Sequence, residues 1–173
     1  VSTHSSHVTH EVEYKNLRYF RRLPAGMYDI GVPVSTISNL SNVFGEGTKT
    51  KEFVTRYLRA QHADIFFADA VILVEGSAER MMLPHFLRNK FPFLDRCYIT
   101  TLDIGGSHAH RLRPLIDALG ILTLVITDLD AGLKKAAVPV QRNADQITNN
   151  PTLRSWMKLM HLGSTVDELL ELP

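Results

Sequence analysis

Five acidic residues stand at or just beyond the ends of three apolar segments of this sequence, where they could form one site. They are Glu75, Glu79, Asp103, Asp128 and Asp130. Residues i and i+2 of a strand point to the same side, so Asp128 and Asp130 can face one site together. Glu75 and Glu79 are four residues apart and share a face if a helix begins near Ser77.

Such a group of carboxylates favours metal chemistry. Several carboxylates close together repel one another unless a positive charge lies between them. Oxygen-only ligands suit hard divalent cations, Mg²⁺ or Mn²⁺. Two such ions about 4 Å apart would activate a water and stabilise the leaving oxygen of a phosphodiester. Any one of these acids could equally be solvated or cap a helix, so the prediction of a two-ion site depends on the whole set.

The segments that carry these acids alternate between two periodicities. The stretches 69–76, 97–106 and 121–130 read as strands, and 77–91 and 107–120 read as helices. Strand, helix, strand, helix, strand in this order predicts an α/β fold with a parallel sheet and right-handed crossovers. Because ligands bind outside the carboxyl ends of parallel strands, we expect the acids to meet there.

The flanking segments are less regular. Residues 1–48 are mixed, with strand-like alternation in 32–47, and 49–67 has the apolar spacing of a linking helix. We place a catalytic core at 68–148, with one short strand at 136–140, and a helical segment at 149–173. In the last segment Asn150 should cap a helix that Gly163 ends, and Thr165 and Glu168 have the spacing of a capping box.

Composition narrows the class of protein. The chain has 173 residues, 45% of them hydrophobic, a formal net charge of +1 and a single cysteine. One cysteine excludes a disulfide framework and a cysteine-rich zinc site, and His4, His7 and His10 lack the cysteine or acid spacing of a zinc site. No apolar run reaches the length of about 18 residues that a membrane span needs. We expect a cytoplasmic protein without a membrane partner, in which nucleic-acid binding depends on local patches or metal ions.

A glycine pair precedes the second predicted helix. Gly105 and Gly106 let the backbone approach a ligand, and Ser107 would cap the helix near amides that suit a phosphate. Arg111 could contact a nucleic-acid backbone. A tight turn, a simple cap and a solvated helix face explain the same residues, and His108 and His110 read more simply as surface or hydrogen-bonded histidines.

The order of these motifs resembles a known catalytic module. Glu-Gly after one strand, Gly-Gly after the next and Asp-x-Asp after the third resemble the Toprim domain, over roughly residues 69–132. More narrowly, "FFADAVILVEGSAERMMLPHF", "DIGGSHAHRLRPLIDALG", "ITDLDA" and "NNPTLRSW" resemble the overcoming-lysogenization-defect (OLD) family of ATP-dependent endonucleases. The resemblance implies a Rossmann-like Toprim sheet in a metal-dependent DNA endonuclease. It also implies an ATPase–nuclease, bacterial or phage-encoded, that forms a homo-oligomer through its full-length chain.

The resemblance also assigns roles to the acids and to a lysine. Glu75, Glu79, Asp128 and Asp130 would hold two Mg²⁺ or Mn²⁺ ions, with Asp103 as a further ligand or an orienting group. An assisting lysine is expected after the Asp-x-Asp pair. Lys134 and Lys135 lie too close to that loop, Lys158 falls on a predicted helix, and a position beyond Pro173 stays open.

The first residues resemble the end of an ABC-type ATPase. In "STHSSHVTHE", His4 would be the switch histidine that senses the γ-phosphate of ATP. The chain contains no GxxxxGK[ST] phosphate loop. ATP would therefore act only through an ATPase portion outside this chain. We expect this chain to be the carboxyl-terminal portion of a longer protein.

Two other functions remain open from the residues alone. The first is a phosphatase or receiver-like domain with one strand-end aspartate, such as Asp128, as phosphate acceptor. The second is a non-enzymatic docking module that uses the α/β unit as a scaffold. Stability that does not depend on divalent ions would favour the docking module.

Overall fold

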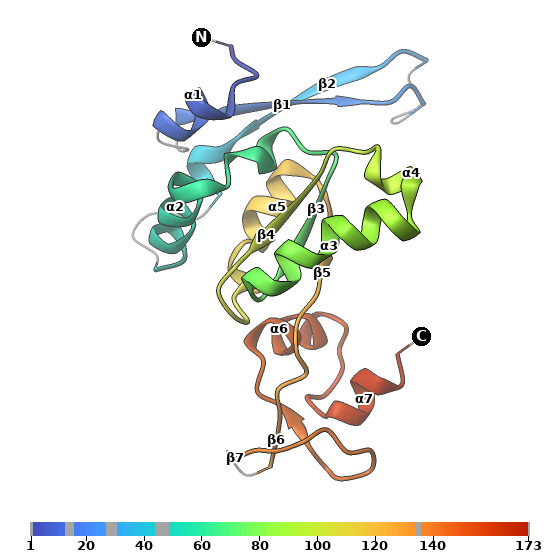
Figure 1. Cartoon of the computed structure of the whole chain (residues 1–173). Coiled ribbons are helices and arrows are strands. Elements are labelled where there is room, and N and C mark those ends of the chain that lie inside the picture. Colours follow the sequence, from blue (N-terminus) through green and yellow to red (C-terminus); the bar gives the residue numbers. More distant parts are fainter. Residues whose placement is uncertain (1, 13–15, 27–30, 44–48, 134–135, 173) are drawn as a thin grey trace.

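The computed structural model describes residues 2–12, 16–26, 31–43, 49–133 and 136–172. An N-terminal hairpin, a central α/β core and a C-terminal unit follow one another along the molecule (Figure 1). Among the described residues, no helix is long and apolar enough to cross a membrane.

The core is built on a parallel sheet of three strands. These are β3 (Ala70–Val74), β4 (Ile99–Asp103) and β5 (Leu122–Val125), in the order β4-β3-β5. Ala70 lies opposite Ile99 on one side and Leu122 on the other, so all three strands end at the same edge. The sheet confirms the predicted α/β fold, and it brings the ends of all three apolar segments together.

Two helical crossovers join these strands. Between β3 and β4 lie α3 (Ser77–Lys90), with Pro84 inside it, and α4 (Pro92–Asp95). Between β4 and β5 lie a 3-10 turn, η5 (Ala109–Arg111), and α5 (Arg113–Leu119), which ends at Gly120 in the left-handed region, φ 59°.

The second of these helices begins later than predicted. We expected a helix from residue 107 with Ser107 as its cap, but α5 begins only at Arg113. Pro114 occupies its first turn, where the fixed φ of proline favours a helix start. The prediction that Ser107 caps this helix is therefore wrong.

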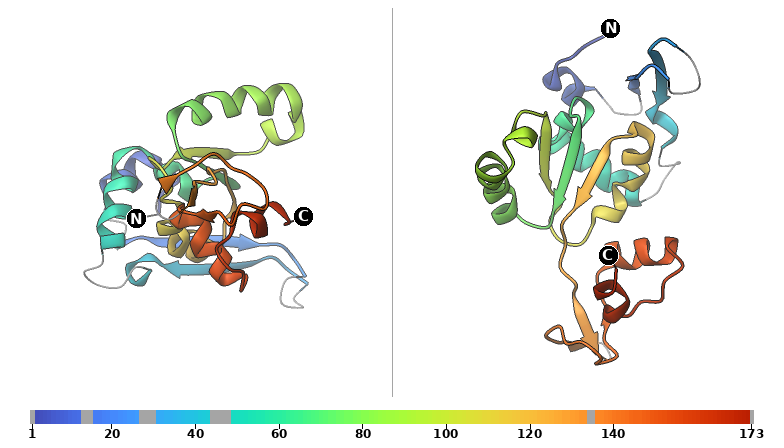
Figure 2. Two further views of the ribbon diagram at one scale, coloured as in Figure 1. Left: turned by 90° about the horizontal axis from the view of Figure 1, so that it is seen from below. Right: turned by 90° about the vertical axis from the view of Figure 1, so that its right-hand side faces the viewer.

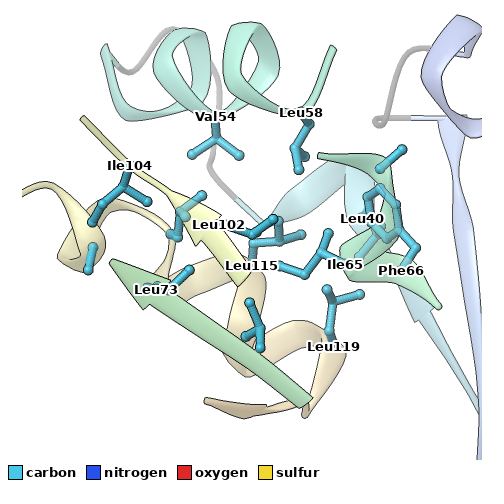
Figure 3. Close-up of a cluster of buried hydrophobic side chains, with 14 residues drawn as sticks. Leu40, Val54, Leu58, Ile65, Phe66, Leu73, Leu102, Ile104, Leu115 and Leu119 are labelled. Carbon is cyan, nitrogen blue, oxygen red and sulfur yellow. The ribbon is translucent and has the colours of Figure 1, made fainter. Parts of the chain in front are cut away.

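The main hydrophobic core lies on one face of the sheet. Helix α2 (Lys49–Gln61) and the 3-10 turn η4 (Ala63–Phe66) pack there with α5 against the strands, as Val54, Leu73 and Leu115 show in Figure 3. Helix α3 lies on the opposite face (Figure 2) and contains no buried residue among those described. On that side of β5, Leu122 and Leu124 are 76% and 55% exposed.

The N-terminal part contains a short helix and a hairpin. Helix α1 (Ser6–Glu11) precedes β1 (Arg18–Leu23) and β2 (Val34–Asn39), which pair antiparallel and lead into η3 (Leu40–Asn42). We predicted only the second of these strands. Leu40 belongs to the main core, which ties the hairpin to the α/β unit.

The C-terminal unit lies beyond the carboxyl ends of the strands (Figure 1). Instead of one strand at 136–140 it holds a small antiparallel sheet of β6 (Ala131–Leu133), β7 (Ala136–Ala137) and β8 (Ile147–Thr148). Two helices follow, α6 (Pro151–Leu159) and α7 (Val166–Leu170). The cap at Asn150 and the capping box of Thr165 and Glu168 are confirmed, but α6 ends at Leu159, before Gly163.

Candidate metal centre

The carboxylate of Glu75 is turned toward the end of β5. Its Oε1 accepts hydrogen bonds from the Thr127 hydroxyl, from the backbone amide of Asp128 at 3.2 Å and from the Asn150 side-chain amide at 3.2 Å. Three donors on one carboxylate oxygen fix the orientation of the group. The structure thus brings the end of β3 and the acidic tail of β5 into direct contact.

Asp130 lies in the same acidic group. Burial raises the pKa of its carboxyl, and the negative charges of Glu75 and Asp128 raise it further, against a hydrogen bond from Asn150 that lowers it. Its backbone is left-handed, with φ 46°. A raised pKa with two carboxylates among its causes is the electrostatic signature of like charges that share one region.

Glu79 lies in the first turn of α3, and its carboxylate is directed back toward the strand end. A Cβ added to Gly76 would meet Glu79 Oε2 at 3.1 Å, so this carboxylate lies against the residue that follows Glu75. The helix starts at Ser77, and Glu79 is in its first turn, where the helix dipole favours a negative charge.

Asp103, the last residue of β4, lies on the side of β3 opposite to β5 and contacts α3. Its carboxylate accepts a hydrogen bond from the Ser77 hydroxyl at 3.0 Å and pairs with the Arg80 guanidinium at 3.5 Å. The His62 ring nitrogen lies 4.0 Å from the same carboxylate. Asp103 therefore joins β4 to the first turn of α3, an arrangement that suits the orienting role more than that of a ligand.

Two residues of the preceding segment reach Asp103, and sequence reasoning did not find them. The Tyr57 hydroxyl donates to the Asp103 backbone carbonyl at 2.8 Å, and its ring stacks on the buried His62. Burial raises the pKa of Tyr57 and lowers that of His62. Both residues lie in a segment that we interpreted only as a linker, and no motif marks them.

The glycine loop supports the site through its backbone. The Gly106 amide donates to the Glu75 backbone carbonyl at 2.9 Å, so this amide is already engaged. Gly105 and Gly106 have φ of 64° and 100°, which side chains rarely adopt. The Ser107 carbonyl accepts from the hydroxyl of the buried Thr152 at 2.9 Å. The loop is thus held between β3 and α6.

The basic residues that follow this loop contact other side chains of the core and of α6. Arg111 stacks over the ring of Phe53 at 5.0 Å. His110 contacts the Thr152 hydroxyl at 3.3 Å, and burial, then the Arg111 charge, lowers its pKa. The ring of His108 lies edge-on to Phe53, and within the described part of the chain its buried Nδ1 has no hydrogen-bond partner.

The remaining predicted positions lie elsewhere or outside the described residues. His4 is exposed ahead of α1, next to a turn in which the Ser5 amide donates to the Thr3 hydroxyl. Lys158 is in the last turn of α6, roughly 12 Å along the helix from the Asn150 cap at a rise of 1.5 Å per residue. Lys134 and Lys135 lie outside the described residues.

The donor chemistry of this edge fits a hard divalent cation. Oriented carboxylates with a raised pKa at Asp130 provide oxygen ligands and an excess of negative charge. Within the ranges that the structure describes, no group of three His, Cys, Asp or Glu side chains is already arranged to hold a metal ion. The acids that follow β3 and β5 are gathered, and their side chains would have to move for a cation to be fully coordinated.

Comparison with known proteins identifies this part of the chain. Residues 66–130 match the family model described as "Overcoming lysogenization defect protein-like, TOPRIM domain". The chain is also 30% identical over 111 residues to "Endonuclease GajA" of Bacillus cereus (strain HuB5-5). That match covers 61% of this chain and 16% of the relative, so the chain matches about a sixth of the relative's length.

Proposed function

From residues 66–130, which are an OLD-like Toprim domain, we propose that this chain is the metal-dependent nuclease portion of a longer ATPase–nuclease. Its substrate is DNA, and its reaction is hydrolysis of a phosphodiester bond. The relative is named an endonuclease. The carboxylate oxygens at the strand ends are ligands that suit metal-dependent hydrolysis.

The contact between Glu75 and the tail of β5 carries this proposal. Oε1 of Glu75 lies 3.2 Å from the amide of Asp128, although 53 residues separate the two in the sequence. Among the described residues, the hydrogen bonds to this carboxylate all go to Oε1, so Oε2 is available to a cation. An oriented glutamate beside two aspartates is a group that holds Mg²⁺ or Mn²⁺ in proteins.

The acids take different roles in this proposal. Glu75, Glu79, Asp128 and Asp130 hold two cations, which when bound lower the pKa of a water and stabilise the leaving oxygen. Asp103 orients the first turn of α3 through Ser77 and Arg80 and so sets the direction of Glu79.

Binding of DNA to this edge requires positive charge, because the acids repel phosphates. We propose that the cations supply most of it and that Arg111, in η5 after the glycine loop, adds to it, with Gly105, Gly106 and Ser107 lining the approach. Oligomerisation and the control of cleavage by ATP would depend on portions of the longer protein outside this chain.

Plasmid nicking in Mn²⁺ tests this function. Glu75→Gln and Asp128→Asn remove a charge at nearly constant shape, and each should abolish nicking while leaving the unfolding transition intact. Asp117→Asn, on the exposed end of α5, is the matched control and should cut like the unaltered chain. If both site variants retain full nicking, the proposed function is wrong.

The phosphatase or receiver-like alternative predicts a different product. It requires a phosphoryl group on Asp128 after incubation with a phosphoryl donor, which mass spectrometry of the intact chain would detect. A chain that nicks DNA and takes up no phosphoryl group would exclude this alternative.

A further inference from the structure

Asn150 is the most completely bonded side chain near the acids, and only its role as a helix cap followed from the sequence. It is fully buried, with 0% exposure. Its Oδ1 accepts from the backbone amides of Thr152 at 2.9 Å and Leu153 at 3.1 Å. These bonds close the first turn of α6, and a capping serine or aspartate could make them equally well.

The other end of the side chain makes bonds that a cap does not need. Nδ2 contacts the Thr127 hydroxyl at 2.7 Å, the Asp128 backbone carbonyl at 2.8 Å and Glu75 Oε1 at 3.2 Å. Thr127 in turn donates its own proton to Glu75 Oε1. Nδ2 therefore reaches Glu75 both directly and through the Thr127 hydroxyl.

The orientation of this amide is fixed by its surroundings. If it were flipped, Nδ2 would face two backbone N–H groups, and Oδ1 would face a carboxylate and a carbonyl oxygen. Both ends would then be repulsive. Only a side chain with an acceptor at one end and a donor at the other, at this length, satisfies both sides.

We infer that Asn150 is a positioning residue that sets the orientation of Glu75 for cation binding and couples it to α6. Its Nδ2 donates to Oε1 of Glu75 and holds the segment after β5 through the Thr127 hydroxyl and the Asp128 carbonyl. Hydrogen-bonded partners behind a ligand orient it and strengthen metal binding, and their loss typically lowers affinity by about 10–100-fold. This inference rests on the proposed function, since it assigns Glu75 to a cation.

Asn150→Ser is the decisive variant, because serine retains the cap of α6 and removes the donor toward Glu75. Isothermal titration with Mn²⁺ should show a dissociation constant at least about tenfold higher than in the unaltered chain. Asn149→Ser is the matched control, because the adjacent Asn149 is exposed and its side chain contacts Arg154. The control should bind Mn²⁺ like the unaltered chain.

A second measurement separates positioning from a purely structural role. Urea unfolding in EDTA should show that Asn150→Ser keeps a cooperative transition. A purely structural role would lower stability in EDTA and leave the Mn²⁺ affinity of the folded protein unchanged, which would overturn the inference. If Asn150→Ser does not fold, Thr127→Val breaks the hydroxyl link and spares the α6 cap, and it should show the same loss of affinity.

The outcomes distinguish the two proposals. If the unaltered chain binds no Mn²⁺, the proposed function fails and this role of Asn150 fails with it. If the unaltered chain binds Mn²⁺ and the folded Asn150→Ser and Thr127→Val variants bind it equally tightly, only the inference about Asn150 is overturned.

Discussion

The hydroxyl of Tyr57 donates a hydrogen bond of 2.8 Å to the backbone carbonyl of Asp103. Tyr57 lies on α2, outside the sheet, and Asp103 is the last residue of β4. The bond ties the helix that leads into the core to the strand end beside the acids. A displacement of α2 would therefore shift Asp103 and, through Ser77 and Arg80, the first turn of α3.

Asp103→Asn should lower the free energy of unfolding by about 1 kcal/mol, because it weakens a half-buried pair with Arg80 and the bond from Ser77. Urea unfolding in EDTA measures this change. Asp117→Asn removes a more exposed pair with Arg113 and should change stability by less than about 0.5 kcal/mol. Equal effects of the two substitutions would show that the contacts of Asp103 with Arg80 and Ser77 do not contribute to the free energy of unfolding.

His62 should make the protein less stable in mild acid. Burial, then the Arg80 charge, lowers the pKa of His62 below the ordinary 6.5, while Asp103 and Asp64 act in the opposite direction. Below pH 6.5, His62 binds a proton in the unfolded chain more readily than in the folded chain. The stabilising contribution is thus complete above pH 6.5 and is lost as the pH falls toward the folded pKa.

His62→Phe keeps a ring against Tyr57 and removes the titrating group. Urea unfolding between pH 7.5 and pH 5 in EDTA should show a shallower loss of stability for this variant. His110, whose pKa is also lowered, contributes equally to both proteins and cancels in the comparison. His85→Phe, at an exposed position on α3, is the control, and an identical effect of both substitutions would contradict the prediction.

Gly106→Ala should destabilise the loop that supports Glu75. Its φ of 100° is unfavourable for any residue with a Cβ, at a cost of about 1–3 kcal/mol. A Cβ would meet nothing within 4 Å, so the cost comes from the backbone alone. Gly31→Ala is the control, at an equally open site without a positive φ. Thermal unfolding compares the two, and matching melting temperatures would refute the explanation.

Thr165→Ala should loosen α7 by about 1 kcal/mol, because the Thr165 hydroxyl accepts from the Glu168 amide. The same hydroxyl donates to the Glu168 carboxylate at 2.7 Å, so this bond is lost as well, while the bond from the Thr165 backbone amide to that carboxylate remains. Hydrogen exchange of the α7 amides measures the change. Ser164→Ala, one residue earlier and exposed, should leave their protection unaltered.

Much of the core could be predicted because its signals are local. The apolar run 71–74 and the alternation of strand and helix patterns over residues 69–130 predict a parallel α/β unit without knowledge of distant contacts. Asn150 and the pair Thr165 and Glu168 are likewise local signals for helix starts, and the structure has both caps.

The remaining features depend on contacts between distant residues. The start of α5 was missed because Pro114 competes with the pattern of a longer helix. The β6–β8 sheet was missed because its strands are only two or three residues long and carry almost no periodicity. The bond between Asn150 and Glu75 spans 75 residues, and no spacing rule reports it.

The order of strands in the core has a consequence for synthesis. The central strand, β3, is made first, and its two neighbours end only at residues 103 and 125. A ribosome adds about 5–20 residues per second, so the nascent β3 remains without its second neighbour for on the order of several seconds. Until β5 is made, one edge of this strand of five apolar residues, Ala70 to Val74, has no partner in the chain synthesised so far.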